Sequence, residues 1–160
     1  MALTLEDLGW NAAFEREFAL YYSSGWKPAR LIRDNRITYG ALLAEGGGQE
    51  LEVSMSGKVY HEAETDAELP AVGDWVALDL GGEKGEAIIQ ARLKRQSCFS
   101  RRAAGQSAEE QVIASNVNVV VVVTDAGPDL NPRRMERYFT LIARSGAKPV
   151  VLVNKADLFS

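Results

Sequence analysis

Two short, uniformly apolar runs near the end of the 160-residue sequence constrain its fold more than any other feature. Residues 119–123 are five consecutive valines, and residues 149–153 read Pro-Val-Val-Leu-Val. A strand that is apolar at every position, rather than at every second one, is typical of a parallel sheet covered on both faces. Runs of this length suit strands and are far too short to span a bilayer. We therefore predict two buried, parallel strands.

The segment between the two runs has the pattern of a helix. Asn131 is a good N-cap, Pro132 suits the first helical position, and Gly146 is a typical helix terminator. The apolar residues between them recur at helical spacing: Met135, Tyr138, Phe139 and Ile142. Strand, helix and strand in this length predict a right-handed βαβ unit. Because two strands cannot bury both faces of a sheet, we expect this unit to be the incomplete start of an α/β domain.

A polar motif, Asn154-Lys155-Ala156-Asp157, directly follows the second predicted strand. Open α/β sheets bind ligands outside the carboxyl ends of their strands, which is where this motif falls. The Asp157 carboxylate could accept hydrogen bonds from the N1–H and the exocyclic amine of guanine, whereas adenine offers no such pair of donors. Asn154 could bond the other edge of the base, and Lys155 could lay its aliphatic stem over the ring. The alternative is an ordinary polar loop leaving a strand.

A nucleotide hydrolase also needs a glycine-rich loop ending in Gly-Lys-Ser or Gly-Lys-Thr to hold the phosphates. Gly57-Lys58 is followed by Val59, and no such loop precedes Asn154. In most GTPases the phosphate loop comes first in the sequence. The chain is therefore either not a GTPase, or part of a permuted one whose phosphate loop follows residue 160.

The first hundred residues have a different pattern. Residues 4–22 predict a helix, with Thr4 and Asp7 as a capping box. Five short strands are then predicted, punctuated by glycine and proline: 29–32, 37–42, 51–54, 75–78 and 87–90. Such a pattern suits a small closed barrel of the OB type, and strand counting leaves an SH3-like barrel open. Residues 103–111 are small and polar and are predicted to be a linker.

The net charge of −4 is unevenly distributed. Most of the excess acid lies before residue 92, whereas one stretch without acidic residues carries all of Arg92, Lys94, Arg95, Arg101 and Arg102. This basic stripe could contact RNA phosphates, and its alternative is an ordinary solvated edge. Trp75 and Tyr39 could stack on bases, but their positions favour the barrel core.

Composition excludes several classes of site. Cys98 is the sole cysteine and His61 the sole histidine, so an internal disulfide, a cysteine zinc site and a multi-histidine metal site are not expected in this segment. The acidic N-terminus lacks the basic region and apolar core of a secretory signal. These features suit a reducing cytoplasm, and no membrane association is expected.

Several strings together resemble the RsgA (YjeQ/YloQ) family of circularly permuted, ribosome-associated GTPases, from about Leu8 to Leu158. One departure is Asn118, where the family more often has Asp. The strings are Leu8-Gly9-Trp10-Asn11, Leu69-Pro70-Ala71-Val72-Gly73-Asp74-Trp75-Val76, Arg95 with Ser100-Arg101, Gln111-Val112-Ile113-Ala114-Ser115-Asn116-Val117 and Asn154-Lys155-Ala156-Asp157-Leu158.

The resemblance implies an organisation and a function. It implies an N-terminal helical extension (1–27), a five-stranded OB barrel (28–102), a linker (103–111) and the start of a permuted GTPase domain (112–160). It also implies a monomeric cytoplasmic protein that binds GTP and the small ribosomal subunit with its 16S rRNA, and that hydrolyses GTP during late subunit maturation. Asn154, Lys155 and Asp157 would bind guanine, and the five basic residues would contact rRNA.

The residues for catalysis, for Mg²⁺ and for a C-terminal zinc domain would all follow residue 160. We therefore expect no hydrolysis, and only weak GTP binding, from these 160 residues. The main alternative is an OB-type RNA-binding module without nucleotide activity. An interaction scaffold with neither role is a further alternative, which the acidic first ninety residues favour slightly.

Overall fold

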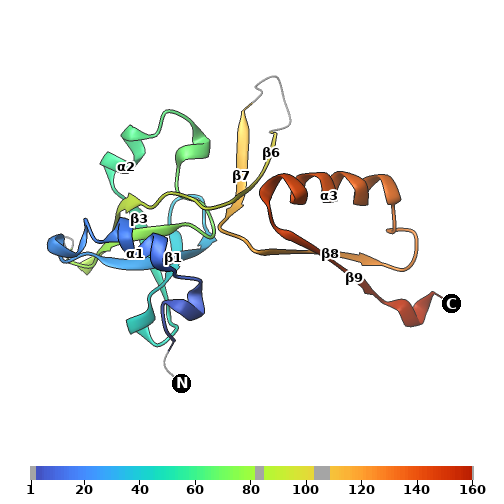
Figure 1. Ribbon diagram of the computed structural model, residues 1–160, viewed down its shortest axis with the longest axis horizontal. Coiled ribbons are helices and arrows are strands. Elements are labelled where there is room, and N and C mark those ends of the chain that lie inside the picture. Colours follow the sequence, from blue (N-terminus) through green and yellow to red (C-terminus); the bar gives the residue numbers. More distant parts are fainter. Residues whose placement is uncertain (1–2, 82–84, 103–108, 160) are drawn as a thin grey trace.

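The computed structural model describes residues 3–81, 85–102 and 109–159. It contains a closed β-barrel and a separate βαβ unit, with a two-stranded ribbon between them (Figure 1). The sequence runs through these parts in order, so the chain leaves the barrel through the ribbon to enter the βαβ unit.

The barrel has the strand order β1-β2-β3-β5-β4. Neighbouring strands are antiparallel except β3 and β5, which are parallel, and helix α2 lies between β3 and β4 in the sequence. This order is that of an OB fold, so the choice between OB and SH3-like barrels is settled in favour of the OB barrel. The elements are β1 (Lys27–Asp34), β2 (Tyr39–Leu42), β3 (Glu50–Met55), α2 (Gly57–Glu62), β4 (Trp75–Asp79) and β5 (Ala87–Arg92).

Alternate residues of the strands fill the barrel. Leu31, Val53, Leu78 and Ile89 are almost completely buried there, together with Tyr39. Trp75 is also buried, at the other side of β4, where it packs against the N-terminal segment. Both aromatic residues therefore belong to the core, as the sequence favoured, and neither offers an exposed ring for base stacking.

The N-terminal segment is not the single helix predicted over residues 4–22. Thr4 and Asp7 do exchange the two hydrogen bonds of a capping box, but the turn that follows ends at Gly9, whose φ is +94°. A new helix then begins because the Asn11 side chain accepts from the backbone N–H groups of Ala13 and Phe14. The resulting elements are η1 (Glu6–Leu8), α1 (Ala12–Phe18) and η2 (Tyr22–Ser24), and further short 3₁₀ turns occur at η3 (Ala44–Gly46) and η4 (Asp66–Glu68).

Aromatic residues attach this segment to the barrel. Trp10, Phe14 and Phe18 are buried against Trp75, and the Trp10 and Trp75 ring centroids lie 4.7 Å apart, edge to face. The N-terminal extension therefore has its own apolar core on the outside of β4.

The ribbon consists of β6 (Cys98–Arg102) and β7 (Glu110–Ser115), which are antiparallel. Glu110 and Gln111, which the sequence placed in a linker, are in strand β7 and pair with Arg102 and Arg101. Residues 103–108 of the predicted linker lie outside the described residues. Part of the connection between the two units is therefore ordered as paired strands, held together by backbone hydrogen bonds.

The βαβ unit agrees with the sequence pattern in its elements. Strands β8 (Val119–Asp125) and β9 (Lys148–Asn154) are parallel, and α3 (Pro132–Ser145) connects them. Asn131 caps the helix by accepting from the N–H of Arg134, and Gly146 follows its end with φ +78°. A final 3₁₀ turn, η6 (Ala156–Leu158), follows β9.

The expected burial of these strands was wrong for this chain. Exposed and half-buried residues alternate in β8 up to Val123, and every residue of β9 is exposed. Helix α3 packs on β9, and a single helix covers only one face of a two-stranded sheet. Apolar residues on both faces therefore identify strands that need neighbours, not strands already covered.

Candidate functional site

The carboxyl ends of the two parallel strands form the candidate site. Asp125 ends β8 and Asn154 ends β9, and the two residues are paired in the strand register. The loops that follow them, residues 126–131 and 155–159, therefore leave the sheet at the same edge. In open α/β sheets this edge is where ligands bind.

The loop after β9 has a defined local structure. The Asn154 Oδ1 accepts from the backbone N–H of Lys155 at 2.9 Å, and Lys155 has a left-handed conformation with φ 54°. A tight turn follows, in which the N–H of Leu158 donates to the carbonyl of Lys155 at 3.1 Å. Asn154, Lys155 and Asp157 all remain exposed to solvent. The bend therefore presents the motif to the outside rather than folding it into the core.

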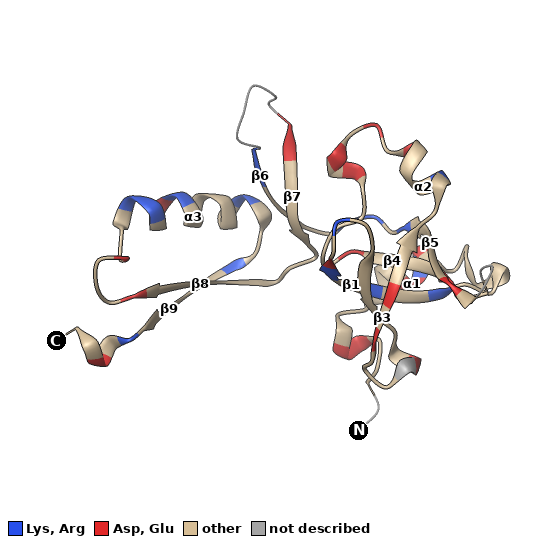
Figure 2. Ribbon diagram, turned by 180° about the vertical axis from the view of Figure 1, so that it is seen from behind, with Lys and Arg blue, Asp and Glu red and all other residues tan. Residues whose placement is uncertain are grey.

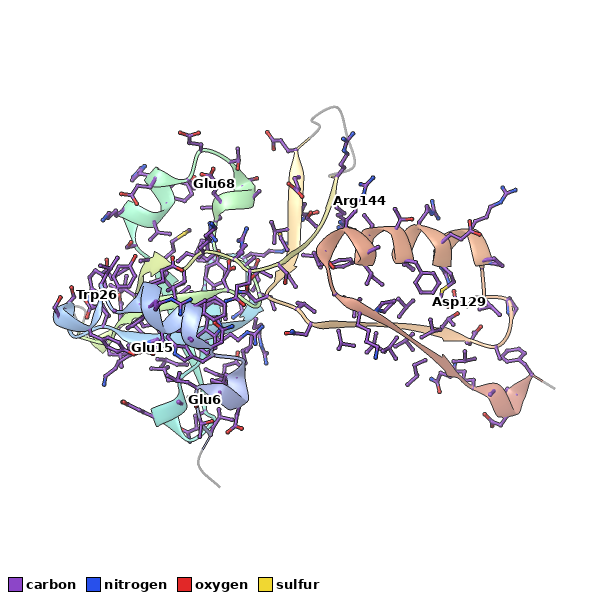
Figure 3. All side chains as sticks on the ribbon, in the orientation of Figure 1. Glu6, Glu15, Trp26, Glu68, Asp129 and Arg144 are labelled. Carbon is purple, nitrogen blue, oxygen red and sulfur yellow. The ribbon has the colours of Figure 1, made fainter. Side chains whose placement is uncertain are left out.

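The loop after β8 is held by its own aspartate. The Asp125 Oδ1 accepts from the backbone N–H groups of Gly127 and Asp129. Asp129 lies in this loop, before α3 (Figure 3). It forms an ion pair of 2.6 Å with Arg134. Neither aspartate was predicted from the sequence as a site residue, although an acidic residue at the end of an apolar strand is a recognisable signal.

The two loops contact each other through Phe159 and Gly127. A Cβ atom at Gly127 would lie 2.4 Å from the Phe159 ring, so the ring rests directly on the glycine backbone. This contact joins the segment that carries Asp157 to the loop that begins at Asp125. It gives the exposed motif a fixed neighbour on the sheet edge.

The unpaired polar groups of the loop after β9 determine which ligands it could bind. Among the described residues, the Asp157 carboxylate has no hydrogen-bond or ion-pair partner, so both oxygens are available to an external pair of donors. The Asn154 amide keeps its N–H donors because its oxygen is the atom used within the loop. A planar base with adjacent N–H donors on one edge and an acceptor on another matches these groups.

The basic stripe does not form a single surface. The Arg95 side chain is only 13% exposed and donates to Asp74 and to the carbonyls of Ala67 and Leu69. Its guanidinium is thus occupied within the protein, because a fully buried carboxylate needs a compensating charge. The prediction that Arg95 contacts RNA has no support in this geometry.

The other basic residues differ in exposure. Arg92 is half-buried and donates to the carbonyls of Glu68 and Leu93, and its pKa is lowered by burial and then by the charge of Arg95. Lys94, Arg101 and Arg102 are exposed.

Glu110, the acidic residue of β7, lies beside the exposed arginines of β6. Arg102 is paired in the strand register with Glu110, so a basic and an acidic position lie opposite each other in the ribbon (Figure 2). The positive charge of the ribbon arginines therefore has an acidic neighbour in the fold, whereas residues 92–102 of the sequence contain no acidic residue.

Comparisons with known proteins agree with this architecture. A family model described as RsgA GTPase matches residues 92–160. Two curated proteins, both called "Small ribosomal subunit biogenesis GTPase RsgA", cover 98% of this chain, one from Opitutus terrae at 41% identity and one from Syntrophotalea carbinolica at 40%.

The chain belongs to the RsgA GTPase family. It spans 44% and 43% of the length of these two relatives. The crystal structure of YjeQ from Thermotoga maritima matches 84% of this chain with a TM-score of 0.61 and 18% identity, and it covers 43% of that structure. At this identity the match supports the fold alone.

Within residues 3–81, 85–102 and 109–159, no helix is long and apolar enough to cross a bilayer. The same residues contain no group of three or more potential metal-ligating His, Cys, Asp or Glu side chains.

Proposed function

We propose that the full-length protein is a GTPase that acts in small ribosomal subunit biogenesis. The names of its relatives support this role, and because the chain spans less than half of their length, the activity of the whole protein is part of the proposal. In this scheme the protein is a cytoplasmic monomer that binds 16S rRNA in the small subunit and hydrolyses GTP to GDP during late maturation. These 160 residues supply the barrel and the guanine-binding loop.

One observation carries the nucleotide part of the proposal. The exposed turn with Asn154, Lys155 and Asp157 lies at the carboxyl end of a parallel strand, and Asp157 is free of partners among the described residues. Asp157 would accept from the N1–H and the exocyclic amine of guanine, and Lys155 would cover the ring. Phosphate-binding, Mg²⁺ and Zn²⁺ ligands would come from residues after 160, so we expect no hydrolysis from this chain alone.

RNA contact is the second part of the proposal. Lys94, Arg101 and Arg102 are the exposed members of the basic stripe and could meet backbone phosphates. This exposure also favours the alternative function, an RNA-binding module with no nucleotide activity. The two functions differ in one respect, since the alternative requires no preference between guanine and adenine nucleotides.

The deciding experiment uses full-length protein and the Asp157→Asn variant. An asparagine presents an N–H donor where the carboxylate presented an acceptor, so guanine loses a hydrogen bond while xanthine, with a carbonyl in place of the amine, gains one. We expect GDP affinity to fall by about 10- to 100-fold and xanthosine diphosphate affinity to rise. Calorimetric titration measures both.

Asp129→Asn is the matched control, because it makes the same change in the neighbouring loop outside the motif. It should leave the preference for GDP unchanged. Wild-type protein that bound ADP and GDP equally would contradict the guanine-binding role and leave the RNA-binding module as the better explanation.

A further inference from the structure

The residues at the end of β7, shortly before β8, are held inside a buried polar joint on the barrel. Ser115 is fully buried and Asn116 nearly so, and Asn116 has a left-handed backbone with φ 53°. Their backbone N–H groups donate to the carbonyls of Val72 and Ser97. The chain is therefore fixed to the barrel at the point where it turns toward the βαβ unit.

The first part of this joint is a buried ion pair. Asp74 has no solvent exposure, and its two oxygens accept from Nε and Nη2 of Arg95, each at 2.8 Å. The same carboxylate accepts from the backbone N–H of Ala71 and from the Ser115 hydroxyl. One acidic side chain thus links the loop before β4, the segment after β5 and the end of β7.

The second part is the Asn116 side chain. Its oxygen accepts from the backbone N–H of Gln96 at 2.8 Å, and its amide donates to the carbonyl of Gly73 at 3.1 Å. The amide of asparagine therefore bridges the same two barrel segments that Asp74 and Arg95 connect.

The third part is Arg30 on β1. It donates to the carbonyls of Gly73, Asn116 and Leu8, and its guanidinium lies 5.9 Å from the centroid of the Trp75 ring. The Arg30 side chain therefore connects β1 to the N-terminal turn and to the residue that follows β7.

Four of the strings that carry the family resemblance meet in this joint. They contribute Leu8, the Gly73-Asp74 pair, Arg95 and the Ser115-Asn116 pair. None of these residues belongs to the guanine-binding loop, which follows the opposite end of the sheet formed by β8 and β9. Buried polar groups that are all satisfied favour one arrangement over others, because any displacement leaves partners unpaired in a low-dielectric site.

We propose that Asp74, Arg95, Ser115 and Asn116 form an interdomain joint that holds the barrel and the βαβ unit in one orientation. The joint does so by fixing the direction in which the chain enters β8. A consequence that rests on the proposed function is that docking of the barrel on the small subunit places the guanine loop at a defined position, so that the joint residues act as positioning residues.

The test is Asn116→Gly in the full-length protein that contains these residues. Glycine adopts the left-handed backbone freely, so the variant removes the two side-chain hydrogen bonds without adding backbone strain. Asn118→Gly is the matched control, because it adds a glycine to the same connection at an exposed position outside the joint.

Spin labels at Glu52→Cys on β3 and Arg137→Cys on α3, in a Cys98→Ala background, report the distance between the two units by pulsed electron resonance. We expect a narrow distance distribution for the parent protein and Asn118→Gly, and a broadened one for Asn116→Gly. If the Asn116→Gly distribution is as narrow as the control and has the same mean, the joint does not set the orientation.

Ser115→Ala gives a milder version of the test in case Asn116→Gly does not fold. It removes one hydrogen bond to Asp74, and a distribution with parental width and mean would again overturn the proposal. In the functional assay, Asn116→Gly should lower the ratio of subunit-stimulated to basal GTP hydrolysis with basal hydrolysis unchanged. Absence of any GTP hydrolysis would count against the proposed function, whereas the distance measurement would still decide on the joint.

Discussion

The backbone of Gly73 lies directly against the carbonyl oxygen of Ser115, and a Cβ atom at Gly73 would stand 1.9 Å from that oxygen. Gly73 also has a φ of +92°, which disfavours any side chain. The loop before β4 and the end of β7 therefore meet backbone to backbone. This contact links the OB barrel to the ribbon strand that leads into the βαβ unit, whose final loop is proposed to bind guanine.

Replacing Gly73 by alanine should destabilise the protein strongly. The new Cβ would collide with backbone that cannot move without breaking the hydrogen bond from Ser115 N to Val72 O. We expect a loss of about 3 kcal/mol or more in the free energy of unfolding. Gly25→Ala is the matched control, because Gly25 has φ +74° but open space around it, and it should cost only about 1 kcal/mol. Urea unfolding measures both, and equal losses would contradict the contact.

Removing the Arg95 guanidinium should be far more costly than removing an exposed one. Arg95→Met leaves the fully buried Asp74 carboxylate without its charge partner, which should cost about 3–5 kcal/mol. Arg134→Met breaks the more exposed pair with Asp129 and should cost at most about 1 kcal/mol. Thermal and urea unfolding of the two variants check the difference. An Arg95→Met variant as stable as wild type would restore Arg95 as a candidate for RNA contact.

The Cys98 thiol should react slowly with alkylating reagents near neutral pH. Burial raises the pKa of this thiol above its ordinary value, and the nearby Arg95 charge offsets that only in part. Because the thiolate is the reactive form, the rate should rise with pH through a midpoint above that of the chain in urea.

The raised pKa of Cys98 also makes the stability of the folded protein depend on pH. The folded chain retains the thiol proton more tightly than the unfolded chain, so the contribution of Cys98 to stability is lost as the pH rises from the ordinary thiol pKa through the folded one. A rate profile whose midpoint matches that of the urea-unfolded chain would contradict the assigned burial effect.

Charge reversal on the ribbon tests the RNA contact. The double variant Arg101→Glu with Arg102→Glu should weaken binding of full-length protein to small ribosomal subunits. The loss of two phosphate contacts should also reduce the slope of log affinity against log salt concentration by about two. Arg133→Glu with Arg137→Glu on α3 makes the same charge change at exposed positions of the other unit. Binding titrations over a range of salt concentrations compare the two. Equal effects of the two double variants would contradict the proposed contact between the ribbon and RNA.

The local sequence pattern was sufficient to predict most of the strands and the helix α3. Alternating residues bounded by glycine and proline predicted the barrel strands, and the cap at Asn131 with the stop at Gly146 predicted the bounds of α3. The predicted N-terminal helix over residues 4–22 was wrong because the apolar stripe continues across Gly9, whose left-handed backbone ends the first turn before Asn11 starts another. Periodicity does not register such an interruption.

Non-local contacts decided the rest. The sequence by itself determined the strand and helix types, the position of Asn154, Lys155 and Asp157 after a strand, and the family, since these depend on residue order and short-range chemistry. Only the tertiary structure showed that Arg95 neutralises Asp74 rather than facing solvent, since that pairing joins residues 21 apart in the sequence. The same is true of the contact between Gly73 and Ser115, because backbone proximity across a fold leaves no mark in the pattern of either segment.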